Sequence, residues 1–153
     1  MKNIYEGADD VSVRIEAGRA IVQILEDDLP EAIPANRLSD GTLRYLCLMA
    51  ILLNPNPMPL ICLDEPELGM HPDLISGLAQ MLIDASAHTQ IIVSTHSPLL
   101  LDAFSDRPAD VLVCRKNKGC STVEPIPKSL YPLLKEESLG TLWMRGELGG
   151  TRW

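Results

Sequence analysis

The sequence predicts an α/β fold in which a mostly parallel sheet lies between layers of helices. Two observations carry this prediction. The apolar run Leu60–Leu63 is too short for a helix and is flanked by prolines, which is typical of a strand buried on both faces. Beyond it, strand-like and helix-like patterns alternate up to about Arg115, as they do in βαβ units.

Residues 1–36 form the first of three predicted segments. Val11–Ile15 alternates apolar and polar side chains, Ala20–Leu25 is a second strand-like run, and Ala17–Arg19 between them predicts a hairpin. Residues 26–36 are acidic and interrupted by proline, which indicates a loop.

The second segment, residues 37–128, is expected to hold the sheet and its helices, and the third, residues 129–153, a helical tail. Apolar spacing and breakers predict helices at Thr42–Asn54, Pro72–Ala87, Leu99–Phe104, Ser129–Lys135 and Ser138–Arg145. The other predicted strands are Gln90–Ser94, Asp110–Arg115, which we expect to be a third buried strand, and the weaker Ser121–Ile126.

Composition excludes several classes of function. The net charge of −8, without a long basic block, argues against loose electrostatic binding to nucleic acid. The longest apolar run, Tyr45–Leu53, is far shorter than the ~20 residues that span a bilayer.

No signal peptide is visible, so we expect a cytoplasmic protein with no membrane partner. The four cysteines form no C-x-x-C pair, which indicates reduced thiols.

Two adjacent carboxylates, Asp64 and Glu65, end the central predicted strand. In open α/β sheets, ligands bind beyond the carboxyl ends of the strands. One carboxylate there can hold Mg²⁺ and the other can orient a water for nucleotide hydrolysis. The plainer alternative is an acid pair that caps the next segment.

Three motifs, in this order and spacing, resemble the C-terminal half of an ATP-binding-cassette-type ATPase, most closely the RecF/SMC-like and OLD-like AAA predicted ATPases. They are Leu38–Thr42, the strand that closes with Asp64-Glu65-Pro66, and Ile91–Pro98. Glu-Pro-Glu at 65–67 and Gly-x-His-Pro at 69–72 join them. The resemblance covers residues 37–115 and extends to the tail at 138–153. It implies a three-layer, P-loop NTPase-like fold that is incomplete, the C-terminal lobe of an ATPase head.

The resemblance assigns roles to the strand-end residues. Asp64 matches the Walker B aspartate, which holds Mg²⁺ beside the phosphates of ATP. Glu65 matches the catalytic glutamate that polarises the attacking water, worth about 10²–10⁴ in rate. His96 matches the switch histidine, which reaches the γ-phosphate, although a lone histidine after a strand is usually a turn residue.

Ser39, Asp40 and Gly41 match the signature loop, which in the family contacts nucleotide held by a second subunit. Free N–H groups and the positive end of the helix dipole suit a γ-phosphate there, but the same residues can simply cap their own helix. Asp40 replaces a family glycine, and the residue after Gly41 is threonine in place of glutamine. The segment Glu67–His71 matches the D-loop region, which lies across the dimer interface in the family; the plainer alternative for His71 is a neighbour of an ordinary helix cap.

The family's phosphate-binding loop is absent from this sequence. None of the ten glycines begins a G-x-x-x-x-G-K-[ST] motif. ATP and Mg²⁺ are the implied cofactors, but we expect the chain to be inactive by itself and to need a missing N-terminal lobe or a second ATPase subunit. A homodimer, DNA and a nuclease remain open as partners. Without the P-loop strand, Ile91–Ser94 is expected to present an exposed apolar edge.

The resemblance therefore predicts ATP binding and hydrolysis, with Mg-ATP held between head-to-tail subunits. The first alternative is a non-catalytic module that lends its signature loop to a P-loop protein. A second is a metal hydrolase that uses Asp64, His71 and His96, and a third is a DNA-binding structural protein, which the acidic charge disfavours. The process that ATP turnover drives is left open among DNA repair, chromosome organisation and phage defence.

Overall fold

The computed structural model describes residues 8–26 and 29–148, and these divide into two compact units. The first unit contains residues 8–62 and 68–92, and the second contains residues 63–67 and 93–148, so the division passes through two neighbouring strands. Within these residues no helix is long and apolar enough to cross a membrane.

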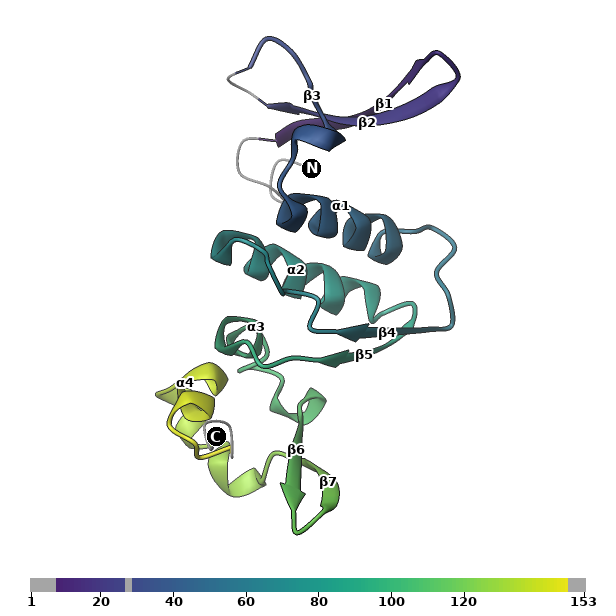
Figure 1. The fold of residues 1–153 in the computed structure, drawn as a ribbon. Coiled ribbons are helices and arrows are strands. Elements are labelled where there is room, and N and C mark those ends of the chain that lie inside the picture. The colour runs from purple at the N-terminus through teal and green to yellow at the C-terminus, as the bar shows by residue number, and fades with distance from the viewer. Residues whose placement is uncertain (1–7, 27–28, 149–153) are drawn as a thin grey trace. The chain divides into compact units, whose positions relative to one another are not determined.

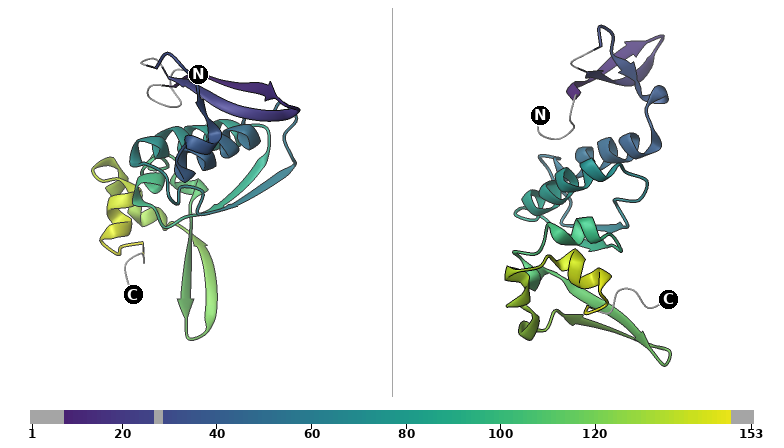
Figure 2. Two further views of the ribbon diagram at one scale, coloured as in Figure 1. Left: turned by 45° about the horizontal axis from the view of Figure 1, so that its top comes forward. Right: turned by 90° about the vertical axis from the view of Figure 1, so that its left-hand side faces the viewer.

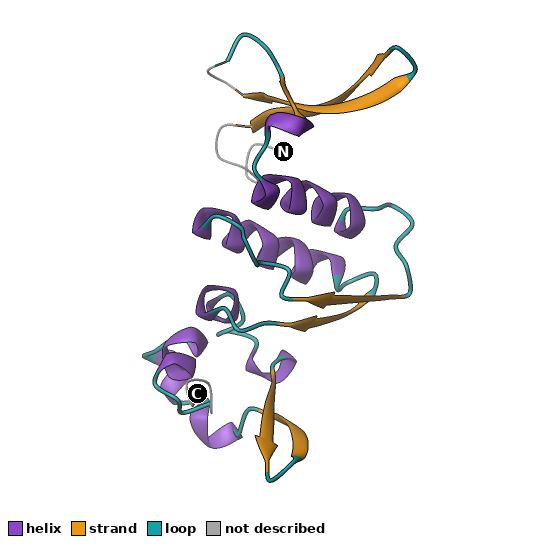
Figure 3. Ribbon diagram, in the orientation of Figure 1, coloured by secondary structure: helices purple, strands orange, loops and turns teal. Residues whose placement is uncertain are grey.

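A β-hairpin opens the first unit. Strands β1 (Ala8–Glu16) and β2 (Arg19–Glu26) pair antiparallel, and β2 also pairs with the short β3 (Ile33–Pro34). Ala17 and Gly18 form the turn with φ of +47° and +76°, as tight hairpin turns require. Figure 3 shows this sheet beside the short 3₁₀ turn Ala35–Arg37 that follows β3.

Two helices build the core of the first unit. In Figure 1, α1 (Asp40–Leu52) and α2 (Pro72–Ala85) run side by side. Their apolar residues recur at helical spacing and are buried, namely Tyr45, Leu48 and Leu52 on α1 and Leu74, Leu78 and Leu82 on α2. Burial raises the pKa of the Tyr45 hydroxyl, because the charged phenolate would lose its hydration.

Helix α2 connects a parallel pair of strands, β4 (Leu60–Asp64) and β5 (Gln90–Ser94). The amide of Gln90 donates to the carbonyl of Pro59 at 3.2 Å, and the amide of Glu65 donates to the carbonyl of Ser94 at 3.0 Å. Both strands therefore run in the same direction, which confirms the predicted α/β fold with a parallel sheet and helices.

The expectation that β4 is buried on both faces is wrong. Ile61 is 8% exposed, whereas Leu60 is 48% exposed. Burial alternates along β4, so in the described residues one face of the strand is open. Ile92 on β5 is 54% exposed, and among the described strands β5 pairs with β4 alone. This agrees with the exposed apolar edge that the sequence predicts for this strand.

The second unit combines a β-hairpin with short helices and helical turns. After α3 (Pro98–Asp102) and the 3₁₀ turn Pro108–Asp110 come β6 (Leu112–Asn117) and β7 (Cys120–Pro125), which Figure 2 shows as a two-stranded ribbon. Two further 3₁₀ turns, Lys128–Leu130 and Leu133–Lys135, lead to α4 (Leu139–Met144). The core of this unit is Val113, Ile126, Leu139, Leu142 and Leu148.

Two expectations for this region are corrected. The strand predicted at 110–115 does not join the parallel sheet, because β6 pairs antiparallel with β7 through a tight turn at Lys118 and Gly119, both with positive φ. The helix predicted at 129–135 is two separate 3₁₀ turns, since Pro132 interrupts it and lacks an amide hydrogen to donate.

Candidate functional site

The ends of β4 and β5 carry the polar residues of the candidate site, all within the second unit. The hydroxyl of Ser94 donates a hydrogen bond to Oδ1 of Asp64, so one carboxylate oxygen is fixed by the neighbouring strand. The backbone amide of Glu65 is bonded to the carbonyl of the same serine. Ser94 therefore holds both acidic residues at the strand end.

Glu65 and His96 lie next to each other at this strand end. Oε1 of Glu65 is 3.8 Å from Nε2 of His96, and the two side chains are 39% and 66% exposed. The backbone of Glu65 has φ of +42°, a left-handed conformation that costs a residue with a side chain about 1–3 kcal/mol. The chain thus leaves the strand abruptly at the residue predicted to be catalytic.

The loop that carries His96 is held on both sides. The hydroxyl of Thr95 donates to Oε1 of Glu67, and the amide of Ser97 donates to the oxygen of Thr95 at 3.0 Å. The hydroxyl of Ser97 then caps α3 by accepting from the amide of Leu100 at 3.3 Å. The sequence predicted Glu67 only as the first residue of the D-loop region, not as a partner of Thr95.

Helix α4 places an aromatic ring beside the histidine. The ring centres of His96 and Trp143 are 6.4 Å apart and the planes are tilted by 35°. Asp102 and Ser105 fix the start of this helix by accepting from the amides of Gly140 at 2.7 Å and Leu139 at 2.9 Å. A side chain at position 140 would not fit, since its Cβ would lie 2.3 Å from the carbonyl oxygen of Pro98.

The predicted signature residues lie in the first unit, at the start of α1. Ser39 is the N-cap, and its hydroxyl accepts from the amide of Thr42 at 3.1 Å. Asp40 is the first residue of the helix and is exposed. Ser39 therefore has the capping role that the sequence allowed. A phosphate contact by the same end of the helix stays a prediction.

Gly41 fits closely against the segment that follows Glu67. A Cβ on Gly41 would lie 2.3 Å from the carbonyl oxygen of Gly69 and 3.2 Å from Cα of Met70. One turn later, Nη1 of Arg44 donates to the carbonyl of Leu68 at 2.9 Å. The first turns of α1 thus hold the segment at 68–70.

His71 caps α2, with Pro72 as the first helical residue. Its Nδ1 lies 3.4 Å from the amide of Asp73 and 3.2 Å from a carboxylate oxygen of the same residue, and the ring is 72% exposed. His71 belongs to the first unit, whereas Asp64 and His96 belong to the second.

The donor set at the strand ends suits Mg²⁺. No three histidine, cysteine or acidic side chains among the described residues gather closely enough to hold a metal ion. Asp64 offers carboxylate oxygens beside the hydroxyl of Ser94, and these are hard oxygen ligands. Mg²⁺ typically binds one or two carboxylates and completes its shell with waters and substrate phosphates, so a single carboxylate such as that of Asp64 fits this ion. The metal hydrolase alternative, which uses Asp64, His71 and His96, stays a prediction.

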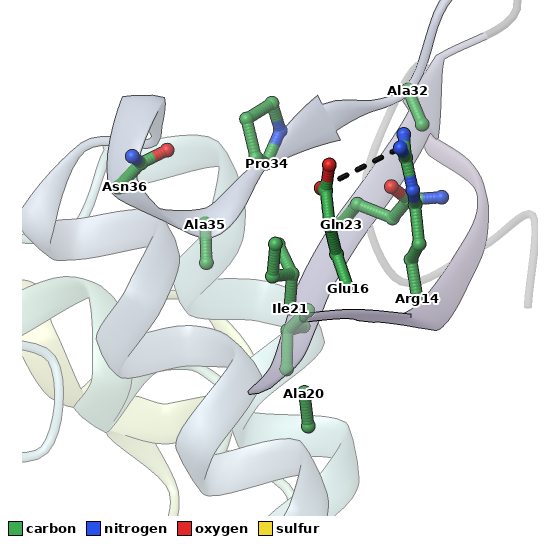
Figure 4. A pocket seen from close by; sticks show the side chains of 10 residues that line it. Arg14, Glu16, Ala20, Ile21, Gln23, Ala32, Pro34, Ala35 and Asn36 are labelled. Atoms are coloured by element: carbon green, nitrogen blue, oxygen red, sulfur yellow. Dashed lines mark ion pairs between the residues drawn. The ribbon is translucent and has the colours of Figure 1, made fainter. Parts of the chain in front are cut away.

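A pocket on the β1–β2–β3 sheet differs from this site in the residues that line it (Figure 4). Its lining includes one acidic residue, Glu16, which is paired with Arg14 at 3.5 Å, and neither histidine nor cysteine. It therefore offers no free acid or base for catalysis.

Comparisons with known proteins agree with the motifs. The family model described as "AAA domain, putative AbiEii toxin, Type IV TA system" matches residues 6–102. The Old nuclease of Escherichia phage P2 is 35% identical over 80 residues, which are 52% of this chain and 14% of that protein. The chain thus spans a small part of this curated relative.

Solved structures show the same fold. A structure from work on ATP-driven dimerization and DNA-stimulated activation of SMC ATPases matches with a TM-score of 0.65 and 14% identity, over 88% of this chain and 84% of that one. The Smc head domain of Pyrococcus furiosus, bound to the C-terminal domain of ScpA, matches with a TM-score of 0.66 and 15% identity, over 88% of this chain and 35% of that one. The fold is therefore that of P-loop NTPase heads.

Proposed function

We infer that this chain, which belongs to the AAA domain family described as putative AbiEii toxin of a Type IV TA system, is the part of an ATPase that carries the hydrolytic residues. The observation that supports this most directly is the strand end itself. There the carboxylate of Glu65, which follows β4, lies 3.8 Å from the imidazole of His96, which follows β5. Beside them, Ser94 holds the carboxylate of Asp64.

Each residue has a proposed task on bound Mg-ATP. Asp64 provides the carboxylate for Mg²⁺, which when bound neutralises charge on the phosphates. Glu65 orients the attacking water and accepts its proton. His96 donates a hydrogen bond to the γ-phosphate, where negative charge must be stabilised. Ser39, Asp40 and Gly41 present the start of α1 to nucleotide on a second subunit, with His71 near the same interface.

The triphosphate itself needs a binding loop that this sequence lacks. No G-x-x-x-x-G-K-[ST] motif occurs in the 153 residues. We propose that a P-loop-bearing lobe or subunit supplies it and that Mg-ATP is held between head-to-tail partners. DNA or a nuclease as a further partner is compatible with this scheme and is left to experiment.

The test supplies the chain with a P-loop-bearing lobe from a related ATPase, either fused or added in trans. ATP binding and phosphate release are then measured for the wild type and for Glu65→Gln. We expect the variant to bind ATP but to lose about 10²–10⁴ in turnover, because the amide cannot accept a proton from water. Turnover near that of the wild type in Glu65→Gln would remove Glu65 from its proposed role.

A second candidate function is a non-catalytic module that lends its signature helix to a P-loop protein. The absent P-loop and the preformed, capped start of α1 favour it. One assay with a P-loop-bearing partner distinguishes the two functions. Glu65→Gln abolishes turnover only if this chain hydrolyses ATP, whereas Gly41→Ala reduces the partner's turnover under either function.

A further inference from the structure

Glu67 is an acidic residue in an unusual environment. It is 9% exposed, and among the described residues only Thr42 and Thr89 are other buried polar residues. Acidic side chains are almost never buried without a partner, because they lose their hydration. The partner of Glu67 is the hydroxyl of Thr95, which donates to Oε1. Its other oxygen, Oε2, is buried without a hydrogen-bond partner in the described structure.

The direction of this hydrogen bond matters for the loop. A threonine hydroxyl has one proton to donate and can accept at its oxygen. Since the proton of Thr95 points to Glu67, the oxygen is available to accept from the amide of Ser97 at 3.0 Å. The carboxylate of Glu67 therefore orders the turn at residues 95–97, which carries His96.

The strand residue before this turn, Ser94, is anchored as well. Ser94 donates to Asp64, and its carbonyl accepts from the amide of Glu65. His96 is thus the exposed residue between two anchored neighbours, with a ring that is 66% exposed, 3.8 Å from Glu65 and 6.4 Å from the ring centre of Trp143.

We propose that Glu67 is a positioning residue, whose carboxylate anchors Thr95 and thereby fixes the loop that presents His96 to Glu65. The proposed function gives Glu67 no direct task on Mg²⁺ or ATP, so its role would act through Thr95. Its importance for turnover rests on the proposed function, whereas its effect on the loop does not. The two parts can therefore be tested separately.

The first experiment uses nuclear magnetic resonance on the labelled 153-residue chain without nucleotide. The probes are hydrogen exchange at the amide of Ser97 and the ring signals of His96 and Trp143. With three histidines in the sequence, the His96 ring signal can be assigned by substituting the others. The variants are Thr95→Val and Glu67→Leu, which remove the hydrogen bond, and Thr95→Ser and Glu67→Gln, which keep a donor and an acceptor.

Thr89→Val is the matched control. Thr89 is buried whereas Thr95 is half-buried, but the hydroxyl of each bonds to a distant residue; that of Thr89 donates to the carbonyl of Met58, before β5 and within the first unit. It reports the general cost of losing a buried threonine hydroxyl.

We expect Thr95→Val and Glu67→Leu to speed exchange at Ser97 by about fivefold or more and to shift the His96 and Trp143 signals, since a typical hydrogen bond is lost. Thr95→Ser, Glu67→Gln and Thr89→Val should keep all three probes near the wild type. The proposal is overturned if Thr95→Val matches Thr89→Val at every probe, or if Glu67→Gln behaves like Glu67→Leu.

The second experiment measures turnover with a P-loop-bearing lobe. Glu67→Leu should lower kcat without changing KM for ATP, because nucleotide binding does not use the loop anchor, and Glu67→Gln should restore most of the rate. If the wild type shows no turnover, the proposed function fails while the exchange result stands. If turnover is normal in Glu67→Leu, the positioning role fails while the ATPase function stands.

Discussion

Oε1 of Glu65 lies 3.8 Å from Nε2 of His96, across the ends of two parallel strands. The distance is longer than a hydrogen bond, so the pair leaves room to share a third group, such as a water or a phosphate oxygen. Both side chains remain open to solvent at 39% and 66% exposure. This is a suitable arrangement for two residues that act on one ligand.

Substituting His96 tests its proposed contact with the γ-phosphate. In the chain supplied with a P-loop-bearing lobe, His96→Ala should lower kcat by about 10²–10³, the usual cost of removing one donor from a developing charge. His88→Ala is the control, since His88 is exposed in the turn before β5. Steady-state phosphate release checks both, and equal rates for the two variants would contradict the role of His96.

The strained backbone of Glu65 leads to a second prediction. At φ of +42°, glycine should be more stable than alanine by roughly 1 kcal/mol, because only glycine adopts this conformation without steric cost. Urea unfolding of Glu65→Gly and Glu65→Ala measures the difference, and neither variant should hydrolyse ATP.

Ala17 provides the matched comparison. It has φ of +47° in the β1–β2 turn, where no catalytic role is proposed, and Ala17→Gly should stabilise the chain by a similar amount while turnover is unchanged. If Glu65→Ala were as stable as Glu65→Gly, the strand end would not be strained.

The features that the sequence predicted well are encoded locally. The run at 60–63, the Pro72 helix start and the spacing of apolar residues on α1 and α2 each lie within one element. Their patterns follow from strand and helix periods and from capping, which act over a few residues. The juxtaposition of Glu65 with His96 followed from the order of the motifs, because parallel strands end on the same side.

The features that the sequence missed depend on distant partners or on exposure. Thr95 and Glu67 are 28 residues apart, and nothing in either local pattern indicates that they bond. The sequence predicts the segment at 110–115 as a third buried strand of the parallel sheet, but the observed strand at 112–117 pairs antiparallel with β7 across a two-residue turn. Leu60 is exposed because burial on a second face needs a further layer, which apolar periodicity in one strand cannot report.

Gly41 leads to a third prediction, on the contact between α1 and the segment at 68–70. Gly41→Ala should destabilise the chain by about 1–3 kcal/mol, since its Cβ meets backbone atoms of Gly69 and Met70 that cannot rotate away. Asp40→Ala is the neighbouring control; it removes a helix-dipole interaction of at most about 1 kcal/mol. Thermal or urea unfolding distinguishes them, and a smaller loss for Gly41→Ala than for Asp40→Ala would contradict the close fit.

Tyr45 leads to a fourth prediction, on stability at high pH. Burial raises the pKa of its hydroxyl above the value of about 10 that the unfolded chain has. The folded state therefore keeps the proton longer, so this contribution to stability is fully present below pH ~10 and is lost as the pH rises through the folded pKa, by at most about 1.4 kcal/mol per pH unit. Tyr45→Phe should remove that part of the slope, whatever its effect on stability at neutral pH. Urea unfolding between pH 8 and pH 11 (roughly the range that brackets the unfolded pKa) measures both slopes, and an unchanged slope in the phenylalanine variant would show that Tyr45 does not titrate differently on folding.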